Sequence, residues 1–270
     1  MGGARLIDTI QLQPEDVLAC VGAGGKTSLC WRVWNELRAG RVRSIFTTTT
    51  HIMEPILPPD TALYLSIDPD VSVLSRLMQR VTGLVVAGAR LDEESTEIKP
   101  NPAAPARPFK LAGLPAARAD QLIADLPGVT WLVEADGARG RSLKWPAAHE
   151  PAIPARATAV VVLASLDAID QPLDETTAHR PEQMARHLGI DRGDILSAEH
   201  VARVMTDPEG GLKNIPHGAR AIAVLNQSRG GSLHPSARPV AQAVLASGRY
   251  ERVIAASLRA EEPVLEVWLP

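Results

Sequence analysis

The chain has 270 residues, a net charge of −3 and 45% apolar residues, which is enough for one large domain or two modest ones. The near-neutral charge and the aromatic content of only 3% argue against a nucleic-acid-binding domain, which would usually show a basic stripe or stacking rings. No apolar run reaches the roughly 18 residues of a membrane span, and the segment Met1–Ala19 lacks the apolar core of a signal peptide. We therefore expect a cytoplasmic protein without a nucleic-acid or membrane partner.

Short apolar segments alternate along the chain with segments of helical length, which indicates an α/β fold with a mainly parallel sheet flanked by helices. The expected strands are Val17–Val21, Arg43–Thr49, Ala62–Ser66, Leu84–Ala87, Thr130–Glu134, Thr158–Ala164, Ala219–Leu225, Arg252–Ala256 and Val264–Trp268. The expected helices are Lys26–Ala39, Pro69–Arg80, Ala116–Asp125 and a segment capped by Ser197 that runs to Met205.

The segment 91–108 interrupts this alternation, because it is first charged and then rich in proline and alanine. It suits a flexible excursion, a small hairpin over the site or a solvated loop. The sequence contains no internal repeat and no obvious interdomain linker. We predict one domain over residues 1–270.

A glycine-rich string, V-G-A-G-G-K-T-S, lies between the first predicted strand and the helix that follows it. Small residues let backbone N–H groups approach phosphate oxygens, and the helix N-terminus attracts the anion. The string has the form G-x-x-G-K-T, two residues shorter than the usual phosphate loop, and it predicts a P-loop NTPase-like fold. The predicted nucleotide-binding residues are Gly22, Ala23, Gly24, Gly25, Lys26, Thr27 and Ser28.

Two carboxylates, Glu134 and Asp136, follow the buried strand Thr130–Glu134. In a P-loop fold the strand beside the loop supplies an acid there, because Mg²⁺ prefers anionic oxygens or ordered water. One carboxylate would orient Mg²⁺ and the other an attacking water or acceptor hydroxyl, and the sequence does not distinguish them. With Lys26 they form the predicted catalytic group.

Four threonines and a histidine, residues 47–51, close the second predicted strand. Threonine suits a strand, but the carboxyl ends of parallel strands are also where α/β sheets bind ligands. We expect Thr49 or Thr50 to reach Mg²⁺ or the γ-phosphate. The predicted metal-binding residues are therefore Thr27, Thr49, Glu134 and Asp136. His51 is either an acid–base group or a structural residue.

A strand-terminal asparagine, Asn226, stands where many GTPases carry N-K-x-D, and we assign it to the nucleotide site. Arg229 replaces the aspartate that reads guanine, and an arginine has no acceptor for the guanine N–H groups. We therefore expect ATP and keep GTP as the alternative.

Basic residues and histidines after the acidic strand suit a second substrate or transferred charge. The same residues would also suit solvent-facing turns or loop stabilisation. The candidates are His51, Arg139, Arg141, Lys144, His149, His179 and Arg180.

Several strings together resemble the YqeC-type family, described as accessory proteins of selenium-dependent hydroxylases. They are V-G-A-G-G-K-T-S (Val21–Ser28), T-T-T-T-H (Thr47–His51), E-A-D-G-A-R-G-R-S-L-K (Glu134–Lys144), H-E-P-x-I-P (His149–Pro154), L-D-A-I (Leu166–Ile169), H-R-P-E (His179–Glu182) and V-L-N-Q (Val224–Gln227). The resemblance implies a P-loop nucleotide-binding protein that assists the maturation of molybdenum hydroxylases, with a molybdenum hydroxylase or its cofactor-maturation proteins as partners. It implies no particular reaction.

Three functions fit these residues. The first is a Mg²⁺-dependent NTPase or phosphoryl-transfer enzyme in cofactor maturation, which neutralises and positions the phosphates. The second is an ATP-dependent ligase or small-molecule kinase, for which short phosphate loops are known. The third is a nucleotide-gated scaffold without turnover.

Overall fold

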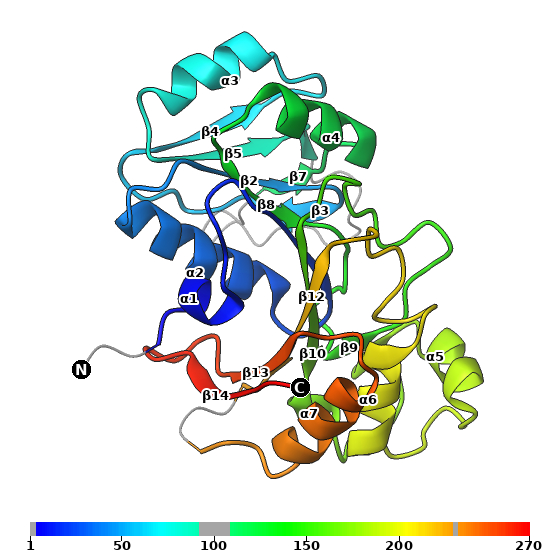
Figure 1. Cartoon of the computed structure of the whole chain (residues 1–270). Helices are drawn as coiled ribbons and strands as arrows, with labels where there is room; N and C mark the ends of the chain where they lie inside the picture. The colour runs from blue at the N-terminus through cyan, green and yellow to red at the C-terminus, as the bar shows by residue number, and fades with distance from the viewer. Residues whose placement is uncertain (1–3, 92–108, 229–231) are drawn as a thin grey trace, which may run out of the picture.

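A nine-stranded sheet forms the centre of the computed structural model, which describes residues 4–91, 109–228 and 232–270. Its spatial order is β14-β13-β12-β10-β1-β8-β2-β5-β4 (Figure 1). The strands are β1 (Val17–Gly22), β2 (Ser44–Thr48), β4 (Thr61–Leu65), β5 (Gly83–Ala87), β8 (Thr130–Glu134), β10 (Ala159–Ser165), β12 (Arg220–Asn226), β13 (Arg252–Ala256) and β14 (Val264–Trp268). Only β14 pairs antiparallel, with β13. The predicted α/β fold with a mainly parallel sheet is confirmed and is consistent with a P-loop NTPase-like fold.

Helices cover both faces of this sheet. The helices are α1 (Leu6–Ile10), α2 (Lys26–Ala39), α3 (Val71–Met78), α4 (Ala116–Asp125), the 3-10 helix η2 (Leu166–Ala168), α5 (Pro181–Leu188), α6 (Ala198–Thr206) and α7 (Ala237–Ala246). Among the helices of the described residues, none combines the length and the apolar character needed for a membrane span.

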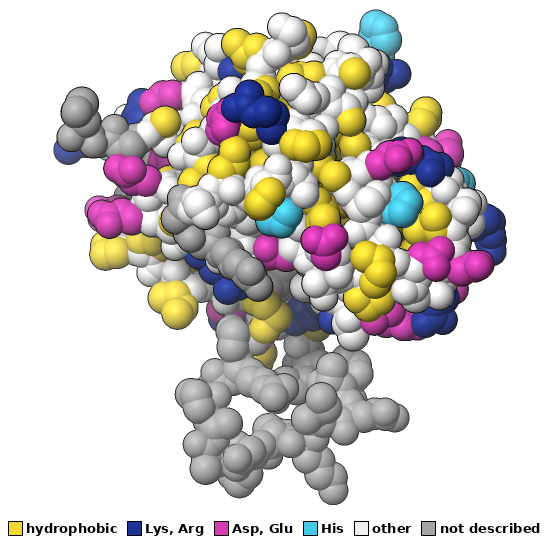
Figure 2. Space-filling model, turned by 90° about the horizontal axis from the view of Figure 1, so that it is seen from below, with side chains coloured by type: hydrophobic (Ala, Val, Ile, Leu, Met, Phe, Trp, Pro, Cys, Tyr) yellow, Lys and Arg dark blue, Asp and Glu magenta, His cyan; other side chains and the backbone are white. Residues whose placement is uncertain are grey.

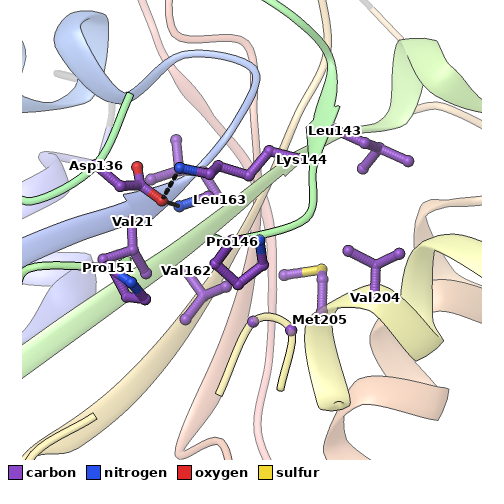
Figure 3. A pocket seen from close by; sticks show the side chains of 13 residues that line it. Val21, Asp136, Leu143, Lys144, Pro146, Pro151, Val162, Leu163, Val204 and Met205 are labelled. Carbon is purple, nitrogen blue, oxygen red and sulfur yellow. Dashed lines mark hydrogen bonds and ion pairs between the residues drawn. The ribbon is translucent and has the colours of Figure 1, made fainter. Parts of the chain in front are cut away.

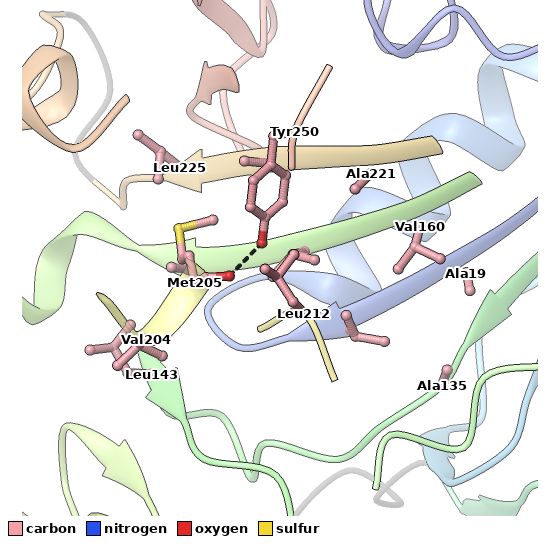
Figure 4. Packing of buried hydrophobic residues seen from close by; sticks show 14 of the residues in the cluster. Ala19, Ala135, Leu143, Val160, Val204, Met205, Leu212, Ala221, Leu225 and Tyr250 are labelled. Carbon is pink, nitrogen blue, oxygen red and sulfur yellow. Dashed lines mark hydrogen bonds between the residues drawn. The ribbon is translucent and has the colours of Figure 1, made fainter. Parts of the chain in front are cut away.

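Alternate side chains of β1 enter two different apolar clusters, because successive strand residues point to opposite faces. Leu18 packs in the cluster that contains Leu29 and Trp34 of α2. Ala19 packs in the other cluster, which contains residues of α3 to α7. Part of this second cluster is shown in Figure 4, where the Tyr250 hydroxyl donates a hydrogen bond to the Met205 carbonyl. The central strands are therefore buried on both faces, as expected for parallel strands.

Two small sheets lie outside the main one. The first joins β3 (His51–Met53), β7 (Lys110–Ala112) and β6 (Arg90–Leu91) in antiparallel pairs. The second joins β9 (Leu143–Lys144) and β11 (Ala178–His179) in parallel. The predicted excursion 91–108 lies outside the described residues apart from Leu91, at the end of β6.

The predicted bounds hold without change for α2, α4, β8, β13 and β14, and they move by one or two residues in the other predicted elements. The short helices α1, α5 and α7 were not predicted. Helix α5 begins at Pro181 and α7 carries Pro239 in its first turn. Proline is tolerated in a first helical turn, but because it breaks helices elsewhere, it makes such a helix hard to predict from the sequence alone.

Candidate functional site

A cleft of about 850 Å³ opens along the edge of the sheet where the parallel strands end. Segments that follow β1, β8, β10, β12 and β13 line it, together with residues of β3, β7 and β11. Open α/β sheets bind their ligands at this edge. The cleft brings together twelve of the predicted site residues: Gly24, Gly25, Lys26, Thr27, Ser28, His51, Glu134, Arg139, Arg141, His179, Arg180 and Asn226.

The phosphate loop, residues 22–28, turns from β1 into α2 through backbone conformations that favour glycine. Gly24 has a φ of +78°, and a Cβ atom there would lie 2.5 Å from the Ser165 Cβ. Gly25 has a φ of +135°, and a Cβ atom there would lie 2.8 Å from the Asn226 Nδ2. Any larger residue would therefore displace the loop. Because these positions carry no side chains, the backbone N–H groups at the α2 N-terminus can approach phosphate oxygens closely, which suits a phosphate cradle.

The Thr27 hydroxyl donates to the Glu134 carboxylate, with distances of 3.2 Å to Oε1 and 2.9 Å to Oε2. These residues come from the start of α2 and the end of β8, which pairs directly with β1. Burial raises the pKa of Glu134 to about 7, although the Lys26 charge and the Thr27 hydroxyl oppose the rise. At neutral pH the Glu134 carboxylate is only partly ionised. Its oxygens and the Thr27 hydroxyl are ligands of the kind that a hard cation binds.

The second carboxylate lies in a different environment, because β8 ends at Glu134 and the alternation of side chains stops there. Asp136 Oδ2 accepts the Gly22 N–H at 3.0 Å, and Lys26 Nζ lies 3.0 Å from Asp136 Oδ1. Burial lowers the pKa of Lys26, but the carboxylates of Asp136 and Glu134 outweigh this and hold it above its ordinary value. Asp136 therefore lies behind the phosphate loop and does not line the cleft.

A second buried ammonium, that of Lys144, extends the ion pair of Lys26 and Asp136 into a larger ionic group. Lys144 Nζ lies 3.1 Å from Asp136 Oδ2 and 3.0 Å from Glu150 Oε2. Figure 3 shows the Asp136 and Lys144 side chains turned toward each other beside a small cavity whose apolar wall includes Val162. Lys144 thus neutralises two carboxylates inside the protein, at the wall of the cleft rather than in it.

The outer end of the ionic group is an arginine. Arg180 Nη1 lies 2.6 Å from Glu150 Oε2 and also donates to the Trp145 carbonyl at 3.1 Å. Burial raises the pKa of Glu150, but Arg180 and Lys144 outweigh this and lower it to about 2. The charges therefore alternate along Lys26, Asp136, Lys144, Glu150 and Arg180, from the phosphate loop to the far wall of the cleft.

Asn226 ties the phosphate loop to the neighbouring strand end. Its Nδ2 donates to the Gly24 carbonyl at 2.6 Å, and its Oδ1 accepts the Leu258 N–H at 3.1 Å. Both ends of the amide therefore hold backbone groups. Nearby, the Asp167 carboxylate accepts the Ser228 N–H at 3.0 Å. Arg229, on which the expected preference for ATP depends, lies outside the described residues.

The threonine run divides into structural and cleft-facing residues. Thr47, Thr48 and Thr49 donate their hydroxyls to the carbonyls of Val86, Glu134 and Ala152, each at 2.8 Å. Thr50, in contrast, lines the cleft, as does His51. Partial burial and the Lys110 charge lower the pKa of His51.

The loop after Asp136, residues 137–142, forms a turn at the wall of the cleft, which we call the cationic turn. It carries Arg139 with a φ of +49°, then Gly140 and Arg141. The partial burial of His179, followed by the charges of Arg180, Lys144 and Arg139, lowers its pKa to about 4. The turn and His179 thus face the same part of the cleft, whereas His149 is exposed and lies outside its lining.

Several lining residues were not predicted, among them Lys110, Ser165, Leu258 and Arg259. Ser165 is the last residue of β10 and Leu258 comes shortly after the end of β13, so the rule that ligands bind at strand ends would have found them. Lys110 comes from a short strand that only the tertiary structure defines.

The donor set fits a phosphate chain with a hydrated Mg²⁺. The glycine cradle, the Lys26 ammonium and the pair formed by Thr27 and Glu134 supply the required groups. Within the three described ranges, no group of three or more His, Cys, Asp or Glu side chains could hold a metal ion. Such a cation would therefore depend on phosphate oxygens and water besides the protein, which is usual for Mg²⁺.

Fold and site together define an α/β protein with a phosphate-loop-type turn at the carboxyl edge of its sheet. Residues 18–182 match the family described as YqeC protein, and the chain belongs to this family. An Escherichia coli (strain K12) protein named "Uncharacterized protein YqeC" is 27% identical over 224 residues, which cover 83% of this chain and 80% of that protein. No solved structure matches the chain. The matched range includes the phosphate loop, both carboxylates and the cationic turn.

Proposed function

We propose that the protein binds a nucleoside triphosphate, ATP in preference to GTP, with Mg²⁺, and uses it as an NTPase or phosphoryl-transfer enzyme. The observation that carries the proposal is the hydrogen bond between Thr27 and Glu134, beside a glycine cradle at the start of α2. A P-loop site needs a hydroxyl for Mg²⁺ and an acid on the adjacent strand, and these two residues supply them.

The residues divide the work between charge neutralisation and positioning. Backbone N–H groups of the loop would bind phosphate oxygens, and the Lys26 ammonium would move from Asp136 toward them. Mg²⁺, when bound, would neutralise the remaining phosphate charge. Glu134 faces the cleft, so we assign the metal-side carboxylate to it. Asp136 accepts from Gly22 and pairs with Lys144, so we assign it to holding the loop.

The test is nucleotide binding by calorimetry, with and without Mg²⁺, together with phosphate release. Lys26→Ala is expected to weaken ATP binding, and Thr27→Ala to remove its Mg²⁺ dependence. Glu134→Gln should lower turnover by about a hundredfold. The matched control is Thr206→Ala, which removes a hydroxyl that donates only to a helical carbonyl. ATP binding that survives both loop substitutions would refute the proposal.

A second candidate function is an ATP-dependent ligase or small-molecule kinase. It is favoured by the extent of the cleft, which continues past the phosphate loop to the cationic turn and to β3, β7 and β11. ADP formation that depends on an added metabolite would distinguish this function from simple hydrolysis. Tight ATP binding with negligible turnover under all conditions would instead favour the nucleotide-gated scaffold.

The biological role that we propose is assistance in the maturation of molybdenum hydroxylases. Its support is the match to the YqeC family over residues 18–182, together with the strings from the phosphate loop to Val224–Gln227 by which the sequence resembles this family. The expected partner is a molybdenum hydroxylase or one of its cofactor-maturation proteins. The test is ATP-dependent co-purification with such a protein, which Lys26→Ala should abolish.

A further inference from the structure

The two ends of the cleft differ in charge. The lining contains six Lys and Arg residues against three Asp and Glu residues, although the whole chain is net negative. Four of these cations come from β7, from the cationic turn and from the residue after β11: Lys110, Arg139, Arg141 and Arg180. We call this part of the lining the cationic end. On the face of the molecule shown in Figure 2, side chains of both charges are interspersed, so the excess of cations is not a general feature of that surface.

The acids near the cationic end do not neutralise it. Glu150 already lies between Lys144 and Arg180, and Glu134 accepts from Thr27 with a pKa raised to about 7. Among the described residues, neither Arg139 nor Arg141 has an ion-pair partner. Partial burial first, and then the charges of Arg180, Lys144 and Arg139, lower the pKa of His179 beside these residues. Unpaired guanidinium groups that line a cleft favour an anionic ligand.

The cationic turn leads to the face of the sheet opposite α2. Helix α2 packs in the cluster of Leu18, whereas Leu143 and Trp145, which follow the turn, pack in the cluster of Ala19. The turn ends beside the phosphate loop, where the Ser142 carbonyl accepts the Ser165 N–H at 3.0 Å. The cleft continues from there to His179 and Arg180, away from the α2 N-terminus at which the nucleotide phosphates are proposed to bind.

We propose that the cationic end is the site of a second substrate, a small molecule that bears a phosphate group, held by Arg139 and Arg141 of the cationic turn. The inference rests on the proposed function only for the choice of the end that the nucleotide leaves open. Guanidinium groups match phosphate oxygens in pairs, and the backbone of the turn beside Gly140 leaves room for a close approach. Arg180 is anchored by Glu150 and forms the fixed wall behind the ligand.

The test is calorimetric titration of inorganic phosphate, and separately of glycerol 3-phosphate, into the full chain saturated with Mg²⁺ and a non-hydrolysable ATP analogue. Arg139→Gln with Arg141→Gln should weaken phosphate binding by about tenfold or more, since two charge-assisted contacts are lost. The affinity for the ATP analogue should remain within about twofold. The control is Arg76→Gln with Arg80→Gln, which removes the same charge from exposed residues outside the cleft and should change neither affinity.

Three outcomes would overturn the proposal. One is the absence of phosphate binding to the nucleotide-loaded protein. Another is a parallel loss of phosphate and ATP-analogue affinity in the double variant, since the arginines would then serve the nucleotide. The third is equal binding of malonate at matched ionic strength, which would indicate a carboxylate ligand.

A further variant separates this inference from the proposed function. In Gly25→Ala the added Cβ atom lies 2.8 Å from the Asn226 Nδ2 and 3.0 Å from the Leu258 Cδ1, so the phosphate loop is displaced there, and none of these nearest atoms belongs to the cationic turn. Phosphate should still bind this variant in the absence of nucleotide, and Arg139→Gln with Arg141→Gln should still weaken that binding. Failure of the ATP analogue to bind any form would refute the nucleotide site alone, whereas loss of phosphate binding in Gly25→Ala would refute the second site.

Discussion

The two ends of the cleft are built in opposite ways. At the phosphate loop, the polar groups of Lys26, Thr27 and Asn226 already have partners inside the protein. At the cationic turn, Arg139 and Arg141 project from a turn and have no ion-pair partner among the described residues. A preformed site loses little conformational entropy when its ligand binds, whereas a turn with free guanidinium groups is ordered by its ligand. The contrast predicts different consequences for substitutions at the two ends and along the ionic group between them.

The largest effect is expected at Lys144, which connects the two ends. Lys144→Met leaves Asp136 and Glu150 with one cation each, and the free energy of unfolding should fall by about 3 kcal/mol. Urea denaturation at pH 7.5 measures the change. The matched control is Lys213→Met, whose ammonium group donates to the Ala147 carbonyl and lies 3.8 Å from an exposed Glu209 carboxylate. Equal losses in both variants would show that the ionic group contributes nothing special to stability.

A somewhat smaller effect is expected at the glycine cradle. Gly24→Ala places a methyl group 2.5 Å from the Ser165 Cβ, so the loop must move. Loss of one or two phosphate contacts should weaken ATP binding by about a hundredfold. Gly128→Ala is a close control, because Gly128 has the same φ of +78° and nothing lies within 4 Å of its added Cβ. If Gly128→Ala weakens ATP binding as much as Gly24→Ala does, the backbone strain common to both positions, and not the close approach to Ser165, causes the loss.

Gly24 and Lys144 also indicate which parts of the site can be predicted from the sequence and which cannot. The glycines, Lys26 and Thr27 form a contiguous string whose spacing carries its chemistry, and the buried strand before Glu134 places the acid beside it. The role of Lys144 depends on contacts with Asp136 and Glu150 that lie across a turn and a loop. No periodicity encodes such contacts. For the same reason β9 and β11 were not predicted, because their two-residue pairing depends on tertiary packing.

The Thr47–Thr50 run illustrates a second limit. β-Branched residues at a strand end look alike in a sequence, yet the Thr49 hydroxyl donates to the Ala152 carbonyl and only Thr50 of the four lines the cleft. Which hydroxyl faces the cleft depends on where β2 ends, and a shift of one residue reverses the side-chain direction. Sequence alone therefore predicted the region of the site and left the individual residue open.

A moderate effect is expected at Asn226, where two hydrogen bonds tie the loop to the end of β13. Asn226→Ala should weaken ATP binding by about three- to tenfold, which is the value of one typical hydrogen bond. Asn226→Asp retains the acceptor for the Leu258 N–H but loses the donor to the Gly24 carbonyl. Equal weakening in both variants would assign the effect to the Gly24 contact, and wild-type affinity in both would exclude a positioning role for Asn226.

The smallest effect is a pH dependence that reports directly on the charge of the cationic end. The pKa of His179 is lowered to about 4 in the folded protein, by partial burial first and then by Arg180, Lys144 and Arg139, whereas an unfolded histidine titrates near about 6.5. The unfolded chain therefore binds the proton more tightly, and His179 lowers stability progressively as the pH falls from about 6.5 toward 4.

The melting temperature of His179→Gln should therefore fall less between pH 7 and pH 5 than that of the wild type. The matched control is His149→Gln, at an exposed position outside the cleft, and its melting temperature should follow that of the wild type. Added phosphate should reduce the difference, because an anion beside His179 offsets the neighbouring cations. If phosphate leaves the difference unchanged, the anion does not bind next to His179, and the positive potential at this end of the cleft serves a purpose other than phosphate binding.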